Sequence, residues 1–332
     1  MKIVSALLLA ASLFSSSALA QNASGIKAEY YNHKPVALSG PISKASGRVV
    51  SLSFNNDGLL LARGDVNKNL DVFSLPKENR LWGKKGDGIL PVNLADIWPL
   101  NLLFAAQGEF DGSRILVLEW NTGKIKGQLS NYGGGRNAVA FHPAKAEVAW
   151  MGPQAGLYRF GVTSGKYAVK GERRHKRPAY GLAYSGDARR LFSVSPDKSA
   201  VVWDTATGAA RMLLTAQRPL IDVAAPRQGN SNIVVIGENR GLLYVLNGIT
   251  GAVIKKIQIP DNGLSNLDFH PFSSDLLLVA GKTHVYFLQV STGKFLREID
   301  TGDKIHALAI SSDGNKIATG HESGAVKIFE AQ

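Results

Sequence analysis

Cysteine is absent from this 332-residue chain, and its absence removes several kinds of chemistry. Without a thiolate, the protein cannot use a cysteine nucleophile, hold an iron–sulfur cluster or build a zinc site from cysteine ligands. It also has no disulfide, so its stability depends on a buried core, which a chain of this length can supply. An exported protein without cysteine is more typical of a bacterial periplasm than of eukaryotic secretion.

Long apolar runs are also missing, except at the start of the chain. Lys2 precedes an apolar run over residues 3–14, and Ala18-Leu19-Ala20 fits a cleavage site before Gln21. This pattern predicts a secretory signal peptide over residues 1–20, with an apolar segment shorter than the roughly 20 residues that span a membrane. We expect residues 21–332 to form one periplasmic or secreted domain without a membrane span.

The short motifs of many catalytic and metal sites are absent as well. The chain contains no Gly-x-Ser-x-Gly, His-x-x-His or His-Glu-x-x-His sequence. The glycine-rich stretch 131–136 ends in Arg136, but the sequence after it has the composition of a strand, whereas a phosphate cradle needs the start of a helix. The sequence therefore predicts no catalytic residue, metal or cofactor.

What the chain does have is a repeat. Large apolar residues recur at steps of 45, 42, 43, 43, 42 and 41, namely Phe73, Leu118, Phe160, Trp203, Leu246, Leu288 and Phe329. A period near 43 is the signature of a β-propeller blade. Within each period, short apolar strands alternate with turns rich in Gly, Asp and Pro, which is an all-β pattern. Seven periods predict a seven-bladed propeller of four-stranded antiparallel blades.

The fourth repeat resembles a known family. It reads Ser193-Val-Ser-Pro-Asp197-Lys-Ser-Ala-Val-Val-Trp203-Asp204, followed by Thr207-Gly208, and so is similar to a WD40 repeat. The resemblance covers residues 49–332, although other residue pairs replace Trp-Asp in the other repeats. It implies a structural hydrogen-bonded tetrad of His175, Asp197, Trp203 and a strand serine, either Ser193 or Ser195.

The last period is one strand short. Residues 304–332 have room for three strands, whereas residues 26–47 precede the first full period and include segments of strand composition. The economical solution is that the segment from Tyr30 to Leu38 pairs with the strand near Val326 to Glu330. That pairing would close the ring and remove two open sheet edges.

The seven histidines have mostly structural interpretations. His142 and His270 precede proline in equivalent turns, and His306 on an inner strand is expected to be a core histidine. His284 and His321 are expected to be exposed on one face, but no metal-binding spacing supports a site there.

The most unusual segment is Glu172-Arg173-Arg174-His175-Lys176-Arg177, in the connection between blades three and four. Such a cluster is either a solvated loop or an anion-binding patch. Lys84, Lys85, Arg136 and Arg218 are predicted in other connections on the same side. We therefore expect a partner-binding rim formed by Arg136, Arg173, Arg174, Lys176, Arg177 and Arg218.

The formal net charge of +12 favours acidic partners, although scattered surface charge would serve solubility alone. Export argues against nucleic acid. The sequence thus predicts a monomeric binding platform for an acidic protein surface or an anionic envelope polymer, with an envelope assembly factor as a special case. The alternative is a propeller enzyme (hydrolase, lactonase, lyase or dehydrogenase subunit) whose channel mouth gathers Glu109, Asp111, Glu238, His321 and Glu322.

Overall fold

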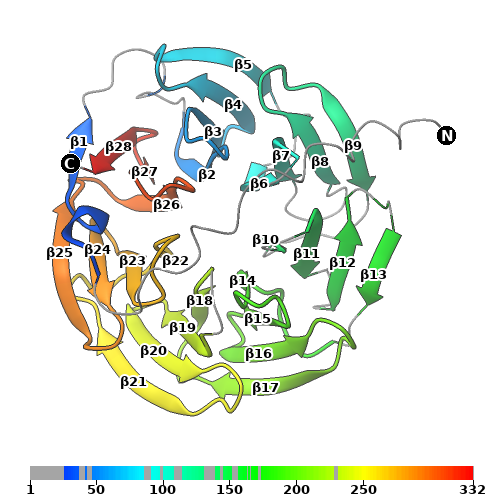
Figure 1. Cartoon of the computed structure of the whole chain (residues 1–332), viewed down its shortest axis with the longest axis vertical. Coiled ribbons are helices and arrows are strands. Elements are labelled where there is room, and N and C mark those ends of the chain that lie inside the picture. The colour runs from blue at the N-terminus through cyan, green and yellow to red at the C-terminus, as the bar shows by residue number, and fades with distance from the viewer. Residues whose placement is uncertain are drawn as a thin grey trace, which may run out of the picture.

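Seven four-stranded antiparallel sheets stand around a central axis in the computed structural model (Figure 1). The predicted seven-bladed propeller is thereby confirmed. The structure describes residues 26–36, 42, 47–85, 91–97, 100–107, 114–130, 139–142, 145–151, 156–162, 164, 166–170, 173–227 and 231–331. The predicted signal peptide and Arg136 lie outside these residues. Among the described residues, no helix has the length and apolar character needed to cross a bilayer.

Each blade is a meander of four strands, and its first strand lies nearest the axis (Figure 1). Blade one contains β2 (Val49–Phe54), β3 (Leu60–Asp65), β4 (Asn69–Ser74) and β5 (Asn79–Lys85). Blade two contains β6 (Pro91–Ile97), β7 (Leu102–Gln107), β8 (Arg114–Glu119) and β9 (Ile125–Ser130). Blade three contains β10 (Val139–Phe141), β11 (Glu147–Met151), β12 (Leu157–Gly161) and β13 (Lys166–Lys170). Blade four contains β14 (Gly181–Tyr184), β15 (Arg190–Val194), β16 (Ser199–Asp204) and β17 (Ala210–Thr215). Blade five contains β18 (Leu220–Ala224), β19 (Ile233–Glu238), β20 (Leu242–Asn247) and β21 (Val253–Gln258). Blade six contains β22 (Asn266–Phe269), β23 (Leu276–Ala280), β24 (His284–Gln289) and β25 (Lys294–Asp300).

Blade seven is completed by the start of the chain, as the sequence predicts. Its strands β26 (Ile305–Ile310), β27 (Lys316–His321) and β28 (Val326–Ala331) are joined by β1 (His33–Val36), which follows the short 3-10 helix η2 (Ala28–Tyr30). The strands β1 and β28 are antiparallel, with His33 opposite Ala331 and Val36 opposite Ile328. The ring is therefore closed by strand pairing between the two ends of the chain.

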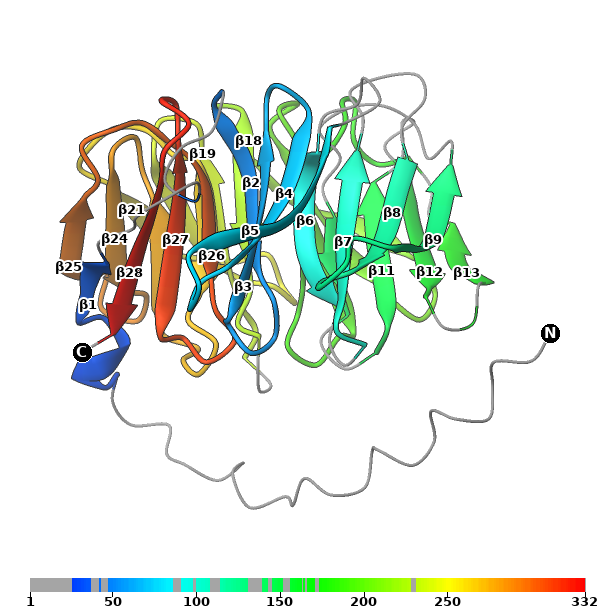
Figure 2. The same ribbon diagram turned by 90° about the horizontal axis from the view of Figure 1, so that it is seen from above.

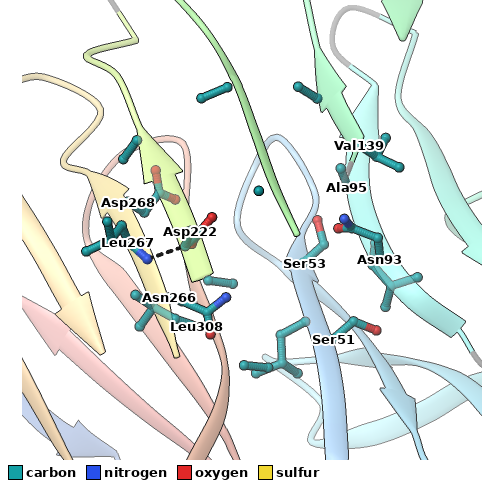
Figure 3. Close-up of a pocket in the computed structure, with 18 of the residues that line it drawn as sticks. Ser51, Ser53, Asn93, Ala95, Val139, Asp222, Asn266, Leu267, Asp268 and Leu308 are labelled. Carbon is teal, nitrogen blue, oxygen red and sulfur yellow. Dashed lines mark hydrogen bonds between the residues drawn. The ribbon is translucent and has the colours of Figure 1, made fainter. Parts of the chain in front are cut away.

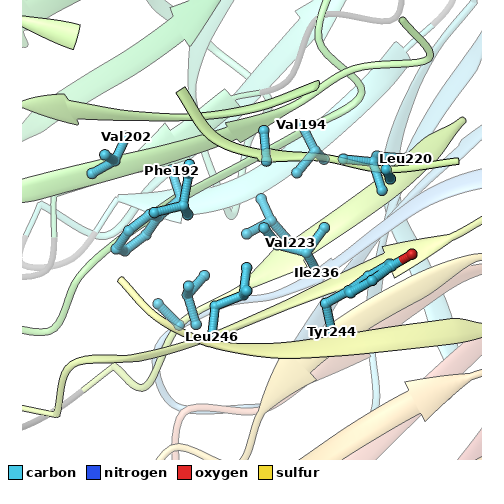
Figure 4. Packing of buried hydrophobic residues seen from close by; sticks show 13 residues of the cluster. Phe192, Val194, Val202, Leu220, Val223, Ile236, Tyr244 and Leu246 are labelled. Carbon is cyan, nitrogen blue, oxygen red and sulfur yellow. The ribbon is translucent and has the colours of Figure 1, made fainter. Parts of the chain in front are cut away.

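The core consists of apolar layers between neighbouring blades. Between blades four and five, Phe192, Val194 and Val202 face Val223, Ile236 and Leu246 (Figure 4). Similar buried clusters occur between other neighbouring blades. A single sheet could not bury both of its faces, and stacking around the axis solves that problem. This explains why the middle strands are apolar on both sides.

Alternating strand direction gives the ring two distinct edges (Figure 2). The connections between blades and the turns between second and third strands lie on one edge, here called the upper edge. The remaining turns lie on the lower edge. In the turns between third and fourth strands, Gly123, Gly208, Gly251 and Gly293 have φ between +65° and +80°. This conformation favours glycine and explains the Gly that follows each of four anchor residues by five positions.

The outer strand of blades one to six carries a register shift against the third strand. The shift lies directly before the anchor residue in five of these blades, and between Ala200 and Val201 in blade four. A bulge disrupts the ladder and twists an exposed sheet edge, which opposes pairing with another chain. The outer circumference of these blades is therefore poorly suited to adding a foreign strand.

Candidate partner-binding surface

The basic loop between blades three and four is fastened to blade four through His175. This side chain is 1% exposed, and its Nε2 and Nδ1 atoms each lie 2.6 Å from a serine Oγ, of Ser193 on β15 and Ser199 on β16 respectively. The neighbouring Arg173, Arg174, Lys176 and Arg177 are exposed. A buried residue in the middle of the cluster thus fixes the loop while its cations remain in solvent.

The network extends from Trp203 to Asp197. Trp203 Nε1 donates to Ser193 Oγ at 2.8 Å, and Ser199 Oγ donates to Asp197. A neutral imidazole protonated on Nδ1 satisfies every group: Ser193 donates to His175, and His175 donates to Ser199. The structure therefore places His175, Ser193, Asp197 and Trp203 in one chain of hydrogen bonds.

The sequence interpretation did not include Ser199, which links His175 to Asp197 in this chain of hydrogen bonds. Its position at the start of β16, two residues after Asp197, was the available signal. Ser195, the alternative to Ser193, instead donates to the carbonyl oxygens of Arg177 at 3.1 Å and Pro178 at 3.3 Å. Asp197 Oδ2 accepts from the backbone N–H of Lys176 at 2.5 Å. Side chains of blade four thus hold the loop backbone at several points.

Burial and hydrogen bonding shift the two titratable groups of the network. Desolvation lowers the pKa of His175 to about 4, although Asp197 opposes the shift. Desolvation also opposes ionisation of Asp197, but hydrogen bonds from Ser199 and the Lys176 backbone outweigh it and hold the pKa of Asp197 below its usual value. His175 is therefore neutral and Asp197 ionised near neutral pH.

We predict that acid weakens the fold partly through His175. An unfolded histidine binds a proton near pH 6.5, whereas folded His175 binds one only near pH 4. The unfolded state thus holds more protons within this window, and the free energy of unfolding falls as pH decreases, by up to about 1.4 kcal/mol per pH unit for one histidine. Urea denaturation between pH 7 and 4.5 would measure the slope, and His175→Gln should reduce it. Parallel pH profiles for the two proteins would contradict the assignment.

The turn 195–198 of blade four joins the loop to the next connection. Leu220 N donates to Ser195 O at 3.3 Å, and Ala216 N donates to Lys198 O at 2.8 Å. The connection 216–219, which carries exposed Arg218, therefore lies beside this turn. Asn239 N in turn donates to Pro219 O at 3.1 Å, which brings the turn of blade five alongside.

These contacts create a continuous basic arc on the upper edge of blades four and five. We call it the basic face, and its exposed members are Arg173, Arg174, Lys176, Arg177, Lys198, Arg218 and Arg240. The sequence interpretation did not find Lys198 and Arg240, because only the fold places their turns beside the two connections. Lys84 and Lys85, by contrast, were wrongly placed in a connection and form the end of strand β5.

The basic face is ordered by its own side chains as well. Arg173 Nε donates to His175 O at 3.0 Å, and its Nη2 donates to Lys176 O at 3.1 Å. Binding a partner would therefore require little ordering of the loop backbone, and less conformational entropy would be lost.

The inner strands of all seven blades enclose a channel of about 770 Å³ (Figure 3). Asp222 on β18 spans two blades, because its Oδ2 accepts from Leu267 N of β22 at 2.8 Å. Desolvation raises the pKa of Asp222 to about 7 and that of Asp96, which accepts from Trp120 Nε1 at 2.6 Å, to about 6. These carboxyl groups are committed to contacts within the ring.

Those residues of the enzyme alternative that the structure describes do not gather at the channel mouth. Glu238 is buried and accepts from Tyr244 Oη at 2.8 Å. His321 was predicted to be exposed, but it is buried at the end of β27, 2.8 Å from Thr319 Oγ1. Only Glu322 is exposed there, whereas Glu109 and Asp111 lie outside the described residues.

The other predicted histidine positions also have definite outcomes. His142 and His270 are buried in their turns, as expected. His306 is not a core residue: it lines the channel, and its Nε2 lies 2.5 Å from Glu322 Oε2. His284 is half-buried and stacks on Tyr286. In the described part of the chain, no three potential ligands gather into a metal-binding group.

Comparison with known proteins supports a WD40-like propeller. Residues 293–330, which run from the start of β25 to Glu330 in β28, match the sequence model of the WD domain, G-beta repeat. A curated relative is WD repeat-containing protein 55 of Arabidopsis thaliana, with 22% identity over 205 residues. The alignment covers 59% of this chain and 56% of that protein, so the chain spans little more than half of the relative's length. The repeat that matches the family model is the last one, although Phe329-Glu330 stands there in place of Trp-Asp.

Proposed function

We propose that this protein is an exported binding platform whose basic face captures an acidic protein surface. The observation that carries the proposal is the arc of seven exposed cations on turns whose backbones are fastened to blade four and to one another. The WD40-like propeller fold suggests a protein-interaction scaffold, which agrees with the capture of a protein partner. Arginine side chains bind carboxylates through two parallel hydrogen bonds, which gives the face a suitable chemistry.

The chemistry of the face also fits an anionic envelope polymer. We favour an acidic protein, because cations spread over several rigid turns present a fixed spatial pattern. The proposed location is the periplasm, on the grounds of the signal-peptide pattern in residues 1–20 and the absence of cysteine. A role in assembling an envelope complex would be one instance of this function.

We predict that reversing charge on the basic face abolishes partner capture without unfolding the propeller. The variant carries Glu at Arg174, Lys176, Arg177 and Arg218, and it keeps Arg173, whose guanidinium group supports the loop. Each exposed ion pair contributes about 0.2–1 kcal/mol, so the loss of four pairs costs about 0.8–4 kcal/mol, and repulsion by the four new carboxylates adds to it. Binding should therefore weaken at least about fourfold. Binding of a decaglutamate peptide and capture from envelope extract would be measured at low and high salt, since exposed charges are screened within about 8–10 Å.

A matched control reverses four exposed cations on the lower edge: Lys77, Lys124, Arg189 and Lys294. It has the same net charge as the test variant, so it separates the position of charge from its amount. Circular dichroism serves as the folding control. A folded test variant that retains its partner at every salt concentration would show that the cluster serves solvation alone. Loss of peptide binding with retained capture from extract would place the physiological interface elsewhere.

A further inference from the structure

Two buried histidines lie where the N-terminal segment meets blades six and seven. His33 begins β1 and is 0% exposed, and His270 lies in the turn after β22 and is 1% exposed. The ring of Tyr30 in η2 stacks on that of His270 with centroids 4.4 Å apart, and His33 stacks on Phe287 of β24. In Figures 1 and 2, β1 lies beside β25 and β28. The contact formed by Tyr30, His33 and His270 is here called the histidine seam.

The hydrogen bonds of the seam suit neutral imidazoles. His33 Nε2 donates to Gly314 O at 3.0 Å, and its Nδ1 atom is buried without a hydrogen-bond partner in the described part of the chain. His270 Nδ1 accepts from Phe272 N at 3.3 Å, which leaves the proton on Nε2, an atom also buried without a partner among the described residues. A second proton would find no acceptor on His33 and would meet an N–H group on His270.

The packing of the seam leaves little room for a charged ring to be solvated. Gly314 has φ of +70°, and a Cβ at this position would come within 2.4 Å of His270 Nε2. Tyr30 covers the ring of His270 by stacking. Burial of an unpaired charge is costly, so protonated histidines would favour movement of the N-terminal segment away from blade six.

The charged groups that face the two histidines add more positive than negative charge. They are Arg297 of β25, Arg227 in the connection after β18 and Asp313 in the turn 311–315. Arg297 donates to the carbonyl oxygen of His33. Asp313 is engaged within its own turn, where it accepts from Asn315 N at 3.0 Å. The seam therefore offers little compensation for a charge on either imidazole.

These surroundings shift both histidines in the same direction. Desolvation lowers the pKa of His33, and Arg297 lowers it further, although the hydrogen bond with Gly314 opposes the shift. Desolvation lowers the pKa of His270 to about 4, with contributions from His33 and Arg227 and with Gly314 and Asp313 in opposition. If the N-terminal segment leaves, both rings reach solvent, where a histidine binds a proton near pH 6.5.

We propose that the N-terminal segment, residues 26–36, is an acid-released latch on blade seven. The open state binds more protons than the closed state between about pH 6.5 and 4, so closure weakens as pH falls through this window. Opening would expose the edge of β28 while the six other blades keep their four strands. The inference does not depend on the proposed function, because the basic face lies on blades four and five.

The test is hydrogen–deuterium exchange of the full-length mature protein at pH 7.5, 6.5 and 5, followed by mass spectrometry. Protection factors remove the pH dependence of intrinsic amide exchange, so they report the opening equilibrium. Protection of residues 30–36 should fall at least about tenfold from pH 7.5 to 5, because each histidine contributes up to about tenfold per pH unit below 6.5. These residues should also exchange faster than β16 at every pH, since the latch opens without global unfolding.

Two substitutions keep the hydrogen bonds of the seam and remove its titration. His270→Asn retains an acceptor near the position of Nδ1, and His33→Gln retains a donor near the position of Nε2. In the double variant, the fall in protection should shrink to about threefold or less. The matched control is His142→Asn, which should leave the fall unchanged, because His142 is buried before a proline in the equivalent turn of blade three. Circular dichroism serves as the folding control.

Three results would overturn the proposal. One is wild-type protection of residues 30–36 that does not change between pH 7.5 and 5. Another is an equal fall in the double variant. The third is protection equal to that of β16 throughout, because the segment would then open only with the whole domain. If the double variant does not fold, His270→Asn alone should still reduce the fall, and an unchanged fall would have the same meaning.

Discussion

Replacing Trp203 with alanine should lower the free energy of unfolding by about 3–5 kcal/mol, as is typical for truncating a large aromatic side chain in a core. Trp203 has no exposed surface and packs between blades three and four with Leu157, Leu191 and Val201. The substitution would also remove the hydrogen bond that Trp203 Nε1 donates to Ser193. Equilibrium urea denaturation followed by circular dichroism would measure the loss.

The conservative variant Trp203→Phe separates the two contributions. It retains an aromatic ring but leaves Ser193 without its indole donor. We expect it to cost about 1–3 kcal/mol, the usual range for an unsatisfied buried polar group. A near-neutral Trp203→Phe combined with a severe Trp203→Ala would mean that packing alone carries the stability. A cost below about 1 kcal/mol for Trp203→Ala would refute the structural role of the network.

Removing the N-terminal closing segment should be as damaging. Deletion of residues 26–36 from the mature protein would open the last blade and expose the edge of β28. It would also remove contacts of Ile26, Tyr30 and Tyr31 with the core between blades six and seven. For a domain of this size we expect the melting temperature to fall by about 10 °C, equivalent to several kcal/mol.

Thermal unfolding of the deleted protein alone and with a synthetic peptide of residues 26–40 would test the closure. The peptide should restore part of the lost stability, because it can refill the same edge. Its scrambled counterpart should not. An unchanged melting temperature would show that the pairing of β1 with β28 contributes nothing to the ring.

The periodicity of the sequence was sufficient to predict the architecture. A spacing near 43 residues between successive anchor residues, from Phe73 to Phe329, defined seven blades. Counting the strands of the last period identified the segment that closes the ring. These inferences worked because each blade is a local unit of consecutive strands, so its pattern lies in consecutive residues. The basic loop 173–177 was visible for the same reason.

Contacts between separate turns could not be predicted from the sequence. Lys198 and Arg240 join the basic face only because hydrogen bonds bring the turns of blades four and five beside the connections between blades. His306 and His321 both belong to blade seven, yet one faces the channel and the other is buried. That difference depends on which side of a strand meets a neighbouring blade. The sequence of one blade does not show which side is covered.

By itself, the sequence determined the repeat, the number of blades, the closing segment and the excess of positive charge. The tertiary structure decided where that charge gathers, which polar groups are buried, and that Lys198 and Arg240, 42 residues apart, lie on one face. The physical reason is that strand and turn formation depends on neighbouring residues, whereas a surface is assembled by stacking one blade against the next.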